Sequence, residues 1–328
     1  MPDVMHAEME MCAGSVSRRG AMIGAALSAF AFDRAVAQSQ GLRIVAPFSA
    51  GTVIDAMARR LAEALSLHLP ERPVVMNRDG ASGTLAFAEL AQSPADGSSV
   101  IFGAASPLVV HPHLRRDPKL DPADYRPVCQ MFEQPLVLVV SRRLELRNVA
   151  DLVELAKKRA GALKFGHYGL ASATHIELLG FARTAGVEVI EVPYRAHGQL
   201  VADLASGALD AAISTPGTFD TGVIQPLMLI AGQPIALYPD LPTSASLGFP
   251  PALPVFGGVF ARAGTSDETL ARLARAFRAA SEEPDFQATA RRLGVLTIFG
   301  DGDAFARRIK EESLRVQALL GRLGLVSQ

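Results

Sequence analysis

The feature that most restricts the fold of this chain is a regular alternation of short apolar segments with longer amphipathic ones after residue 41. The short segments are typical of strands, and the longer ones repeat Leu and Ala near a 3.6-residue spacing that is typical of helices. We expect strands at 42–46, 74–76, 99–102, 136–140, 164–166, 187–192, 211–213 and 257–260, and helices at 52–69, 84–92, 149–159, 175–184, 198–205, 267–282 and 304–320. Such alternation predicts parallel sheets covered by helices on both faces.

The order of these segments also predicts how the chain divides. A second set of alternating strands and helices lies between residues 140 and 250, and the helices that follow it return to the first set. We therefore expect two lobes linked by crossing strands, one formed by residues 38–139 and 252–328 and the other by residues 140–251. The length of 328 residues is sufficient for two such lobes.

Charge and cysteine content exclude several classes of protein. The formal net charge is −1, so no excess of basic residues favours a nucleic-acid or lipid surface as partner. The two cysteines, Cys12 and Cys129, form neither a disulfide framework nor a zinc or iron–sulfur pattern. Cys129 precedes an apolar strand and is interpreted as a small core residue.

The N-terminus has the pattern of an export signal. Arg18 and Arg19 precede an apolar run at 21–32, which is followed by the small-residue sequence Ala35-Val36-Ala37. The run is too short to span a bilayer. We interpret residues 1–37 as a signal peptide, which predicts a periplasmic mature chain. The paired arginines fit the twin-arginine route, although the general secretory route also accepts them. A buried N-terminal helix is the alternative interpretation.

Three junctions between a strand and a helix are rich in Gly, Ser and Thr: residues 47–55, 77–84 and 168–175. Backbone N–H groups and the helix dipole at such a helix start favour an anion, for example a carboxylate. The alternative is that these loops need glycine for turns and hydroxyls for caps, whatever the function. In the first junction, Thr52 and Asp55 have capping-box spacing, and Asp55 is spaced to pair with Arg59. Asp55 is therefore interpreted as a residue that caps and orients its loop.

Motifs for catalysis and metal binding are missing from the sequence. It contains no nucleophile elbow, HExxH helix, phosphate-binding loop or dinucleotide-binding glycine pattern, so we predict neither an enzyme nor a bound cofactor. His167, His175 and His197 stand in three separate loops without the short spacing of metal ligands. No metal site is therefore expected, and His175 is interpreted as a polar residue at the start of a helix.

An ordered series of motifs resembles the Bug-type solute-binding proteins of tripartite tricarboxylate transporters. The matching segments are PFSAGTVIDAMAR at 47–59, NRDGASG at 77–83, PADG at 94–97, VPYR at 192–195, DL at 203–204, GALD at 207–210, LPT at 241–243 and FARAGT at 260–265. The resemblance implies two Rossmann-like α/β lobes with mixed, mostly parallel sheets and a hinge, similar to type II periplasmic binding proteins. It also implies a small carboxylate ligand (a mono-, di- or tricarboxylate or an amino acid) and partnership with the large and small membrane subunits of a transporter.

In that family, the loops equivalent to residues 48–55 and 169–175 hold one carboxylate of the ligand between them. The resemblance and the loop composition together give the expected ligand-binding residues. These are Phe48, Ser49, Thr52, Asp55, Ser82, Ser106, Gly169, Ala171, Ser172, Thr174, His175, Tyr194, Arg195 and Thr215. For Arg195, an ion pair on the surface is an equal alternative.

The chain departs from the family pattern at positions that affect ligand choice. Ala50 stands where proline is usual, Thr52 where a second glycine is usual, and Phe256 where tryptophan is frequent. The segment 214–216 replaces the usual Asp-Asn-x-Pro sequence, so we expect a different distal pocket. Two alternatives to a transport receptor remain: an extracytoplasmic sensor that signals to a membrane kinase, and a binding protein with no transporter of its own.

Overall fold

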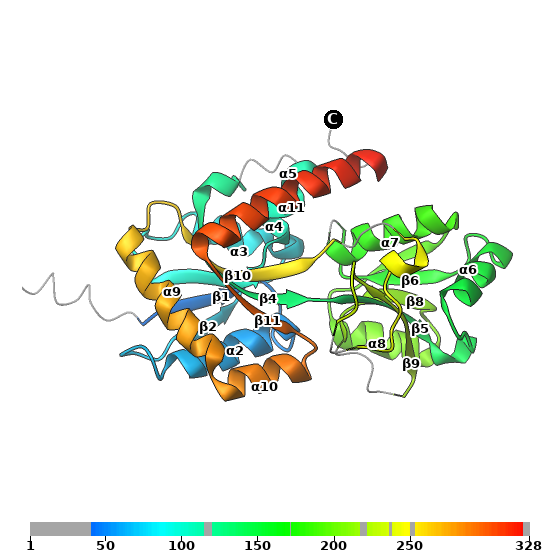
Figure 1. The fold of residues 1–328 in the computed structure, drawn as a ribbon, viewed down its shortest axis with the longest axis horizontal. Coiled ribbons are helices and arrows are strands. Elements are labelled where there is room, and N and C mark those ends of the chain that lie inside the picture. The colour runs from blue at the N-terminus through cyan, green and yellow to red at the C-terminus, as the bar shows by residue number, and fades with distance from the viewer. Residues whose placement is uncertain are drawn as a thin grey trace, which may run out of the picture. The chain divides into compact units, whose positions relative to one another are not determined.

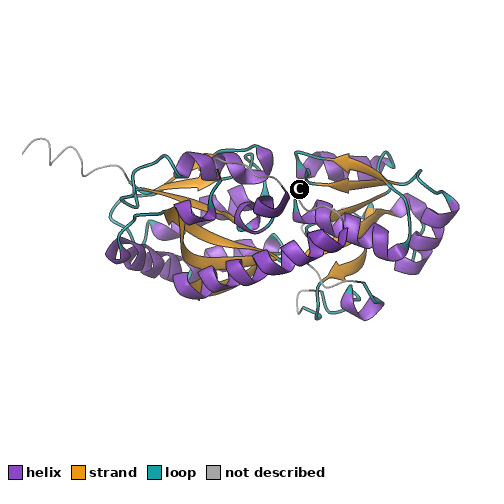
Figure 2. Cartoon of the chain, turned by 90° about the horizontal axis from the view of Figure 1, so that it is seen from above, coloured by secondary structure: helices purple, strands orange, loops and turns teal. Residues whose placement is uncertain are grey.

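The computed structural model describes residues 41–114, 120–170, 172–216, 222–235, 238–249 and 253–323, which form two mixed sheets with helices packed on them (Figure 1). The expected signal peptide lies outside the described residues. A perpendicular view shows helices on both faces of the strands (Figure 2). The fold is of the α/β class with two groups of elements, as the sequence predicts.

The first sheet contains six strands in the order β11-β4-β10-β3-β1-β2. In chain order they are β1 (Arg43–Ala46), β2 (Val74–Asn77), β3 (Ser99–Ala104), β4 (Tyr125–Gln134), β10 (Val255–Arg262) and β11 (Leu296–Asp301). The β2-β1-β3 pairs are parallel, whereas β10 pairs antiparallel with β3 and β4, and β11 antiparallel with β4.

Helices pack against this sheet through two apolar clusters. One cluster joins the sheet to α2 (Val53–Leu65), α9 (Asp267–Glu282) and α10 (Pro284–Arg292). The other joins it to α3 (Thr84–Leu90), α4 (Ser106–Val109) and α11 (Gly302–Leu323), with α5 (His111–Leu114) in contact with α4 and α11.

The second sheet contains five strands in the order β7-β6-β8-β5-β9. They are β5 (Leu136–Ser141), β6 (Lys164–His167), β7 (Ile190–Pro193), β8 (Ala211–Ser214) and β9 (Ile224–Ile230). Helices α6 (Val149–Lys158) and α7 (Ala173–Ala185) share one apolar cluster with this sheet, and α8 (His197–Ser206) shares another. The structure also contains short 3-10 helices, labelled η1 (Ala81–Gly83), η2 (Pro122–Asp124), η3 (Arg142–Leu144) and η5 (Ala245–Leu247).

The chain passes from one sheet to the other and back. β4 ends at Gln134 and β5 begins at Leu136, so the chain passes from the first sheet to the second across Pro135. It returns between β9 in the second sheet and β10 in the first. These crossings are consistent with the expected linkage by strands.

The expectation of mostly parallel pairing overestimates the parallel share. In the described residues four strand pairs are parallel and five are antiparallel. The sequence reading missed β4, β9, β11 and α10, and these three strands pair only antiparallel. Polar residues and prolines interrupt their apolar patterns, for example Pro127 and Glu133 in β4, which hides the strand period.

The expectation that Cys129 is a small core residue is confirmed. Cys129 is a free, fully buried residue of β4, and burial raises the pKa of its thiol. Gly207 ends α8 in the left-handed conformation with φ 79° and ψ 13°. Among the described helices, none combines the length and the apolar composition needed to cross a membrane.

Candidate functional site

The first junction, between β1 and α2, is fixed by a network centred on Asp55. Thr52 is the N-cap of α2, and its hydroxyl accepts the Asp55 N–H at 3.4 Å and donates to the Ser49 carbonyl at 2.9 Å. The Asp55 carboxylate, 4% exposed, accepts the Gly51 N–H at 2.9 Å and pairs with Arg59 at 2.9 Å. The predicted cap and the i,i+4 pair are both confirmed.

Hydrogen bonds of Asn77 extend this network to the end of β2. The side-chain amide of Asn77, at the end of β2, donates to Asp55 at 2.8 Å and to the Phe48 carbonyl at 3.0 Å. The guanidinium of Arg59 donates to the Asn77 side-chain oxygen at 2.9 Å. Burial acts to raise the pKa of Asp55, but hydrogen bonds from Arg59, Gly51 and Asn77 outweigh it and hold that pKa below its usual value. Asp55 is therefore charged and neutralised locally.

The third junction, between β6 and α7, is held by side-chain hydroxyls. Ser172 is the N-cap of α7, and its hydroxyl accepts the His175 N–H at 3.2 Å and donates to the Gly169 carbonyl at 2.8 Å. Thr174 is 4% exposed, and its hydroxyl accepts the Tyr168 N–H at 2.9 Å. Ala171 lies outside the described residues. The two junctions thus present the same arrangement, a hydroxyl-capped helix start behind a glycine turn.

The second junction lies against the third. Gly80, Ala81, Ser82 and Gly83 follow one another with φ between 46° and 130°, a conformation that costs non-glycine residues energy. The Ser82 hydroxyl donates to the Leu170 carbonyl at 3.2 Å. The structure therefore brings the predicted residues Ser82 and Gly169 into one neighbourhood, although they belong to loops of different sheets.

Ser106 lies beside the start of α7. Ser106, at the start of α4, and Ala173, at the start of α7, line one small cavity together with Val255 and Phe256 of β10. Its volume of 10 Å³ has room for about one water molecule. Phe256, where the family often has tryptophan, is 3% exposed and forms a wall of this cavity.

A buried polar cluster surrounds Tyr168. Its hydroxyl lies 2.6 Å from Nδ1 of His197 and 2.9 Å from the Ser214 hydroxyl. Burial raises the pKa of Tyr168 to about 12, and the hydrogen bonds with Ser214 and Thr215 act in the opposite direction. Thr215 is 8% exposed and belongs to this cluster. Sequence reasoning singled out Thr215 but missed Tyr168, whose partners come from distant parts of the chain.

The side chains of four predicted residues take no part in the hydrogen bonds described above; they are Phe48, Ser49, Tyr194 and Arg195. The ring of Tyr194 packs in an apolar cluster, its hydroxyl donates to Asp203 at 2.7 Å, and burial raises its pKa. Arg195 is exposed in the segment between β7 and α8. Phe48 packs against the apolar cluster beneath the first junction, and the Ser49 hydroxyl donates to Asp79 at 3.0 Å. The structure therefore does not group Tyr194 with the other predicted residues.

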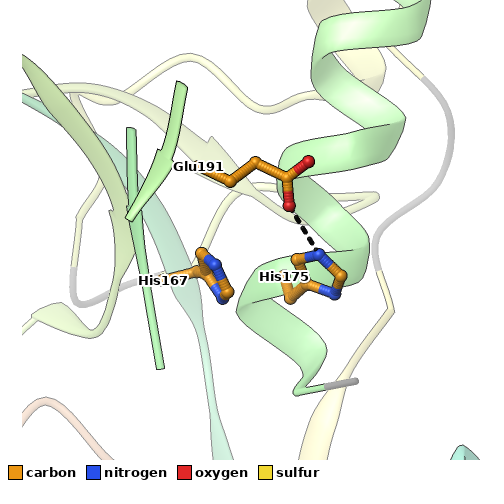
Figure 3. Close-up of side chains that lie close together, drawn as sticks. All are labelled: His167, His175 and Glu191. Atoms are coloured by element: carbon orange, nitrogen blue, oxygen red, sulfur yellow. Dashed lines mark hydrogen bonds and ion pairs between the residues drawn. The ribbon is translucent and has the colours of Figure 1, made fainter. Parts of the chain in front are cut away.

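His167 and His175 lie together with Glu191 (Figure 3). The two imidazole ring centres are 4.6 Å apart, and Nε2 of His175 is 2.7 Å from the Glu191 carboxylate. His197, the third histidine of this region, bonds to Tyr168 instead. Sequence spacing gave no indication of this cluster, because strand pairing rather than sequence proximity assembles it.

Comparison with known proteins identifies the family. Residues 57–325 match the family described as "Tripartite tricarboxylate transporter family receptor". This chain belongs to that family. BugT of Bordetella pertussis (strain Tohama I) is 32% identical over 242 residues, which cover 71% of this chain and 74% of BugT.

Solved structures agree with this family assignment. The structure "R. palustris Rpa4515 with adipate" is 28% identical to this chain with a TM-score of 0.82, and the match covers 88% of this chain and 99% of that one. The periplasmic binding protein BugD, at 24% identity and a TM-score of 0.79, covers the same shares and supports the fold. The family and these neighbours are solute-binding proteins, so this receptor is a binding protein and not an enzyme.

Proposed function

We propose that this receptor binds a small carboxylate between the junctions at 47–55 and 168–175 and delivers it to the membrane subunits of a tripartite transporter. The first sheet with its helices acts as one lobe and the second sheet with its helices as the other, and a hinge movement of the lobes encloses the ligand. The first change of lobe is at Pro135 and not at the expected 139/140, which falls inside β5. Residues 1–37 direct export to the periplasm and are then removed.

The observation that carries this proposal is that two hydroxyl-capped helix starts, one beside each sheet, belong to junctions that are both next to the second junction. Thr52 and Ser172 are the N-caps of α2 and α7. The second junction lies next to both of their loops, because Gly83 is beside Pro47 of the first junction and the Ser82 hydroxyl donates to the Leu170 carbonyl of the third. The first turn of a helix has N–H groups without helical partners, and its dipole favours an anion. Because Arg59 neutralises Asp55, that aspartate does not cancel the attraction at α2.

A dicarboxylate is the favoured ligand class. The adipate-bound relative is similar in sequence as well as in fold, which makes a flexible aliphatic diacid the first candidate. The neutral hydrogen-bonding groups of Tyr168, Ser214 and Thr215 support recognition of a second polar end of the ligand. No cofactor takes part in this binding.

Titration calorimetry with adipate, malate and citrate tests the proposal. We expect at least one acid to bind in a 1:1 ratio, and 1,6-hexanediol, which lacks the carboxylates, to give no heat. Thr52→Glu and Ser172→Glu place an acid at the two helix starts and should weaken binding by about tenfold or more. Ser266→Glu is the matched control, because Ser266 caps α9 by accepting the Thr269 N–H at 3.3 Å. Equal effects of all three variants, or retained affinity in the first two, would contradict the proposed site.

Export is tested separately by N-terminal sequencing of the protein recovered from the periplasm. We expect the mature chain to begin at Gln38. Recovery of an uncleaved chain in the cytoplasm would contradict the export part of the proposal while leaving carboxylate binding untouched.

A further inference from the structure

We propose that His167, His175 and Glu191 form a binding site for a divalent transition metal of the zinc type. One candidate ligand atom of each side chain lies within 4.8 Å of the others (Figure 3). This site adjoins the proposed carboxylate site, because His175 ends the junction at 168–175 and its N–H donates to the Ser172 hydroxyl, but the inference does not rest on carboxylate binding.

Strand pairing explains how the three residues meet. β6 and β7 are parallel neighbours in which Phe165 is paired with Glu191. Because side chains alternate along a strand, Phe165, His167 and Glu191 project to the same face of the sheet. Helix α7 covers this face, since Phe165 and Phe181 stack there, and its first turn supplies His175. The three residues are thus held by regular elements and not by a loose loop.

The tautomer of His167 leaves Nε2 free of a proton, as a metal ligand must be. Its Nδ1 is 3.0 Å from the Gly169 carbonyl, and a carbonyl only accepts, so the proton resides on Nδ1 and Nε2 carries the lone pair. Metal-bound histidines commonly donate their other ring N–H to such a carbonyl. The tautomer that this hydrogen bond selects is therefore the one that a metal requires.

The lone pair of His167 is also unsatisfied. Within the described part of the chain, Nε2 is buried without a hydrogen-bond partner, and the residue is 1% exposed. A buried polar atom without a partner is destabilising and uncommon in folded proteins. A metal ion at this atom provides the missing partner, and this is the observation that distinguishes the cluster from an ordinary histidine–glutamate pair.

His175 and Glu191 complete a plausible set of donors. Two imidazoles and one carboxylate are ligands that zinc accepts, and a fourth position is left for water or another small ligand. The His175 and Glu191 side chains are 12% and 39% exposed, so an ion has access to the site from solvent. Tetrahedral zinc places its ligands about 3.3 Å apart, as follows from bonds of about 2 Å. The partly exposed Glu191 side chain allows this adjustment, in which the 2.7 Å His175–Glu191 pair widens and separations of up to 4.8 Å shorten.

The test uses purified protein without a histidine tag, stripped with chelator and titrated with zinc chloride alone. We expect one zinc ion per chain, and an increase in melting temperature because zinc binds only the folded state. Cobalt substitution should give the visible absorption of a four-coordinate ion. His167→Phe, His175→Gln and Glu191→Gln should each weaken zinc binding by about tenfold or more.

The matched control is His68→Gln. His68 forms a similar pair with Glu283 at 2.8 Å on another part of the surface, so its substitution should leave the zinc affinity unchanged. His167→Phe removes the unsatisfied nitrogen, and we expect it to fold with an unchanged or higher melting temperature in the absence of metal. Zinc affinity no better than millimolar, or binding that survives all three substitutions, would overturn the proposal. Equal weakening in His68→Gln would also overturn it.

Discussion

A carboxylate at the start of a helix normally competes with an anionic ligand for the same positive potential, and Asp55 is arranged to avoid this. Its two oxygens are occupied by Arg59, Asn77 and the Gly51 N–H. The negative charge of Asp55 therefore stabilises the conformation of the loop before α2. In this respect Asp55 is a positioning residue, and its contribution should be visible in stability.

We expect Asp55→Asn to lower the free energy of unfolding by about 1–3 kcal/mol at neutral pH, because the hydrogen bonds to the charged group are lost or weakened. The folded-state pKa of Asp55 is below the unfolded value, so its stabilisation is present above about pH 4 and is lost as pH falls through the folded pKa. The variant should therefore lose less stability than the parent on acidification. Urea unfolding at a series of pH values measures both effects.

Asp79→Asn provides the control for this prediction. Asp79 is exposed and accepts one hydrogen bond from Ser49, which an asparagine oxygen can also accept. Its substitution should change stability by no more than about 0.5 kcal/mol. A similar loss in both variants would show that Asp55 has no special structural role.

Sequence alone predicts the local part of the site and not the distant part. The cap at Thr52 and the Asp55–Arg59 pair follow from spacings of three and four residues, and the structure confirms them. Tyr168, Ser214 and Glu191 were missed because their partners are set by strand order. Tyr194 has a family motif around it, but the motif does not reveal that its hydroxyl is bonded to Asp203.

At the scale of elements, β10 shows why the first sheet tolerates glycine in a central strand. A Cβ atom at Gly258 would lie 2.1 Å from the Cys129 carbonyl oxygen of β4, a distance that real Cβ atoms do not adopt. The irregular register between Gly257 and Gly258 lies at the same place. The close approach of β10 and β4 therefore requires glycine, which a strand pattern read from sequence treats only as a weak point.

We expect Gly258→Ala to reduce the free energy of unfolding by about 3 kcal/mol or more, because the two strand backbones must separate. Gly300→Ala is the matched control. Both glycines oppose Gln130 of β4, one from β10 and the other from β11, but a Cβ at Gly300 would meet Gln130 at an ordinary 3.5 Å. Chemical unfolding of the two variants should differ clearly, and equal destabilisation would contradict the close-approach argument.

Elements with a strong period were predictable and those with a broken period were not. Helix α9 begins and ends at the residues expected from its spacing, 267–282. Strand β4 was missed although it is the central connection of the fold, because its polar residues and Pro127 interrupt the apolar pattern. The mixed pairing of both sheets could not be derived either, since antiparallel neighbours such as β4 and β10 are far apart in sequence.

At the scale of the whole molecule, one buried carboxyl connects the second sheet with the chain that returns to the first. Glu177 of α7 is 8% exposed and accepts the N–H of Leu253, which precedes β10. Burial raises the pKa of Glu177 to about 8, and the hydrogen bond from Leu253 acts in the opposite direction. The group is therefore neutral in the folded protein under conditions where it is charged in the unfolded chain.

This difference predicts that the contribution of Glu177 to stability falls as pH rises from about 5 to about 8. In that range the folded state keeps a proton on Glu177 that the unfolded state has released, so this contribution falls with pH, by a few kcal/mol at most (~1.4 kcal/mol per unit of pKa difference). Glu177→Gln removes the titration, so the slope of its unfolding free energy against pH should be more positive than the parent's in this range. Glu154→Gln, whose parent side chain is 66% exposed in α6, should retain the parent's slope. If Glu177→Gln also retains that slope, the carboxyl at this junction is already ionised in the folded state, and the return of the chain to β10 does not depend on its proton.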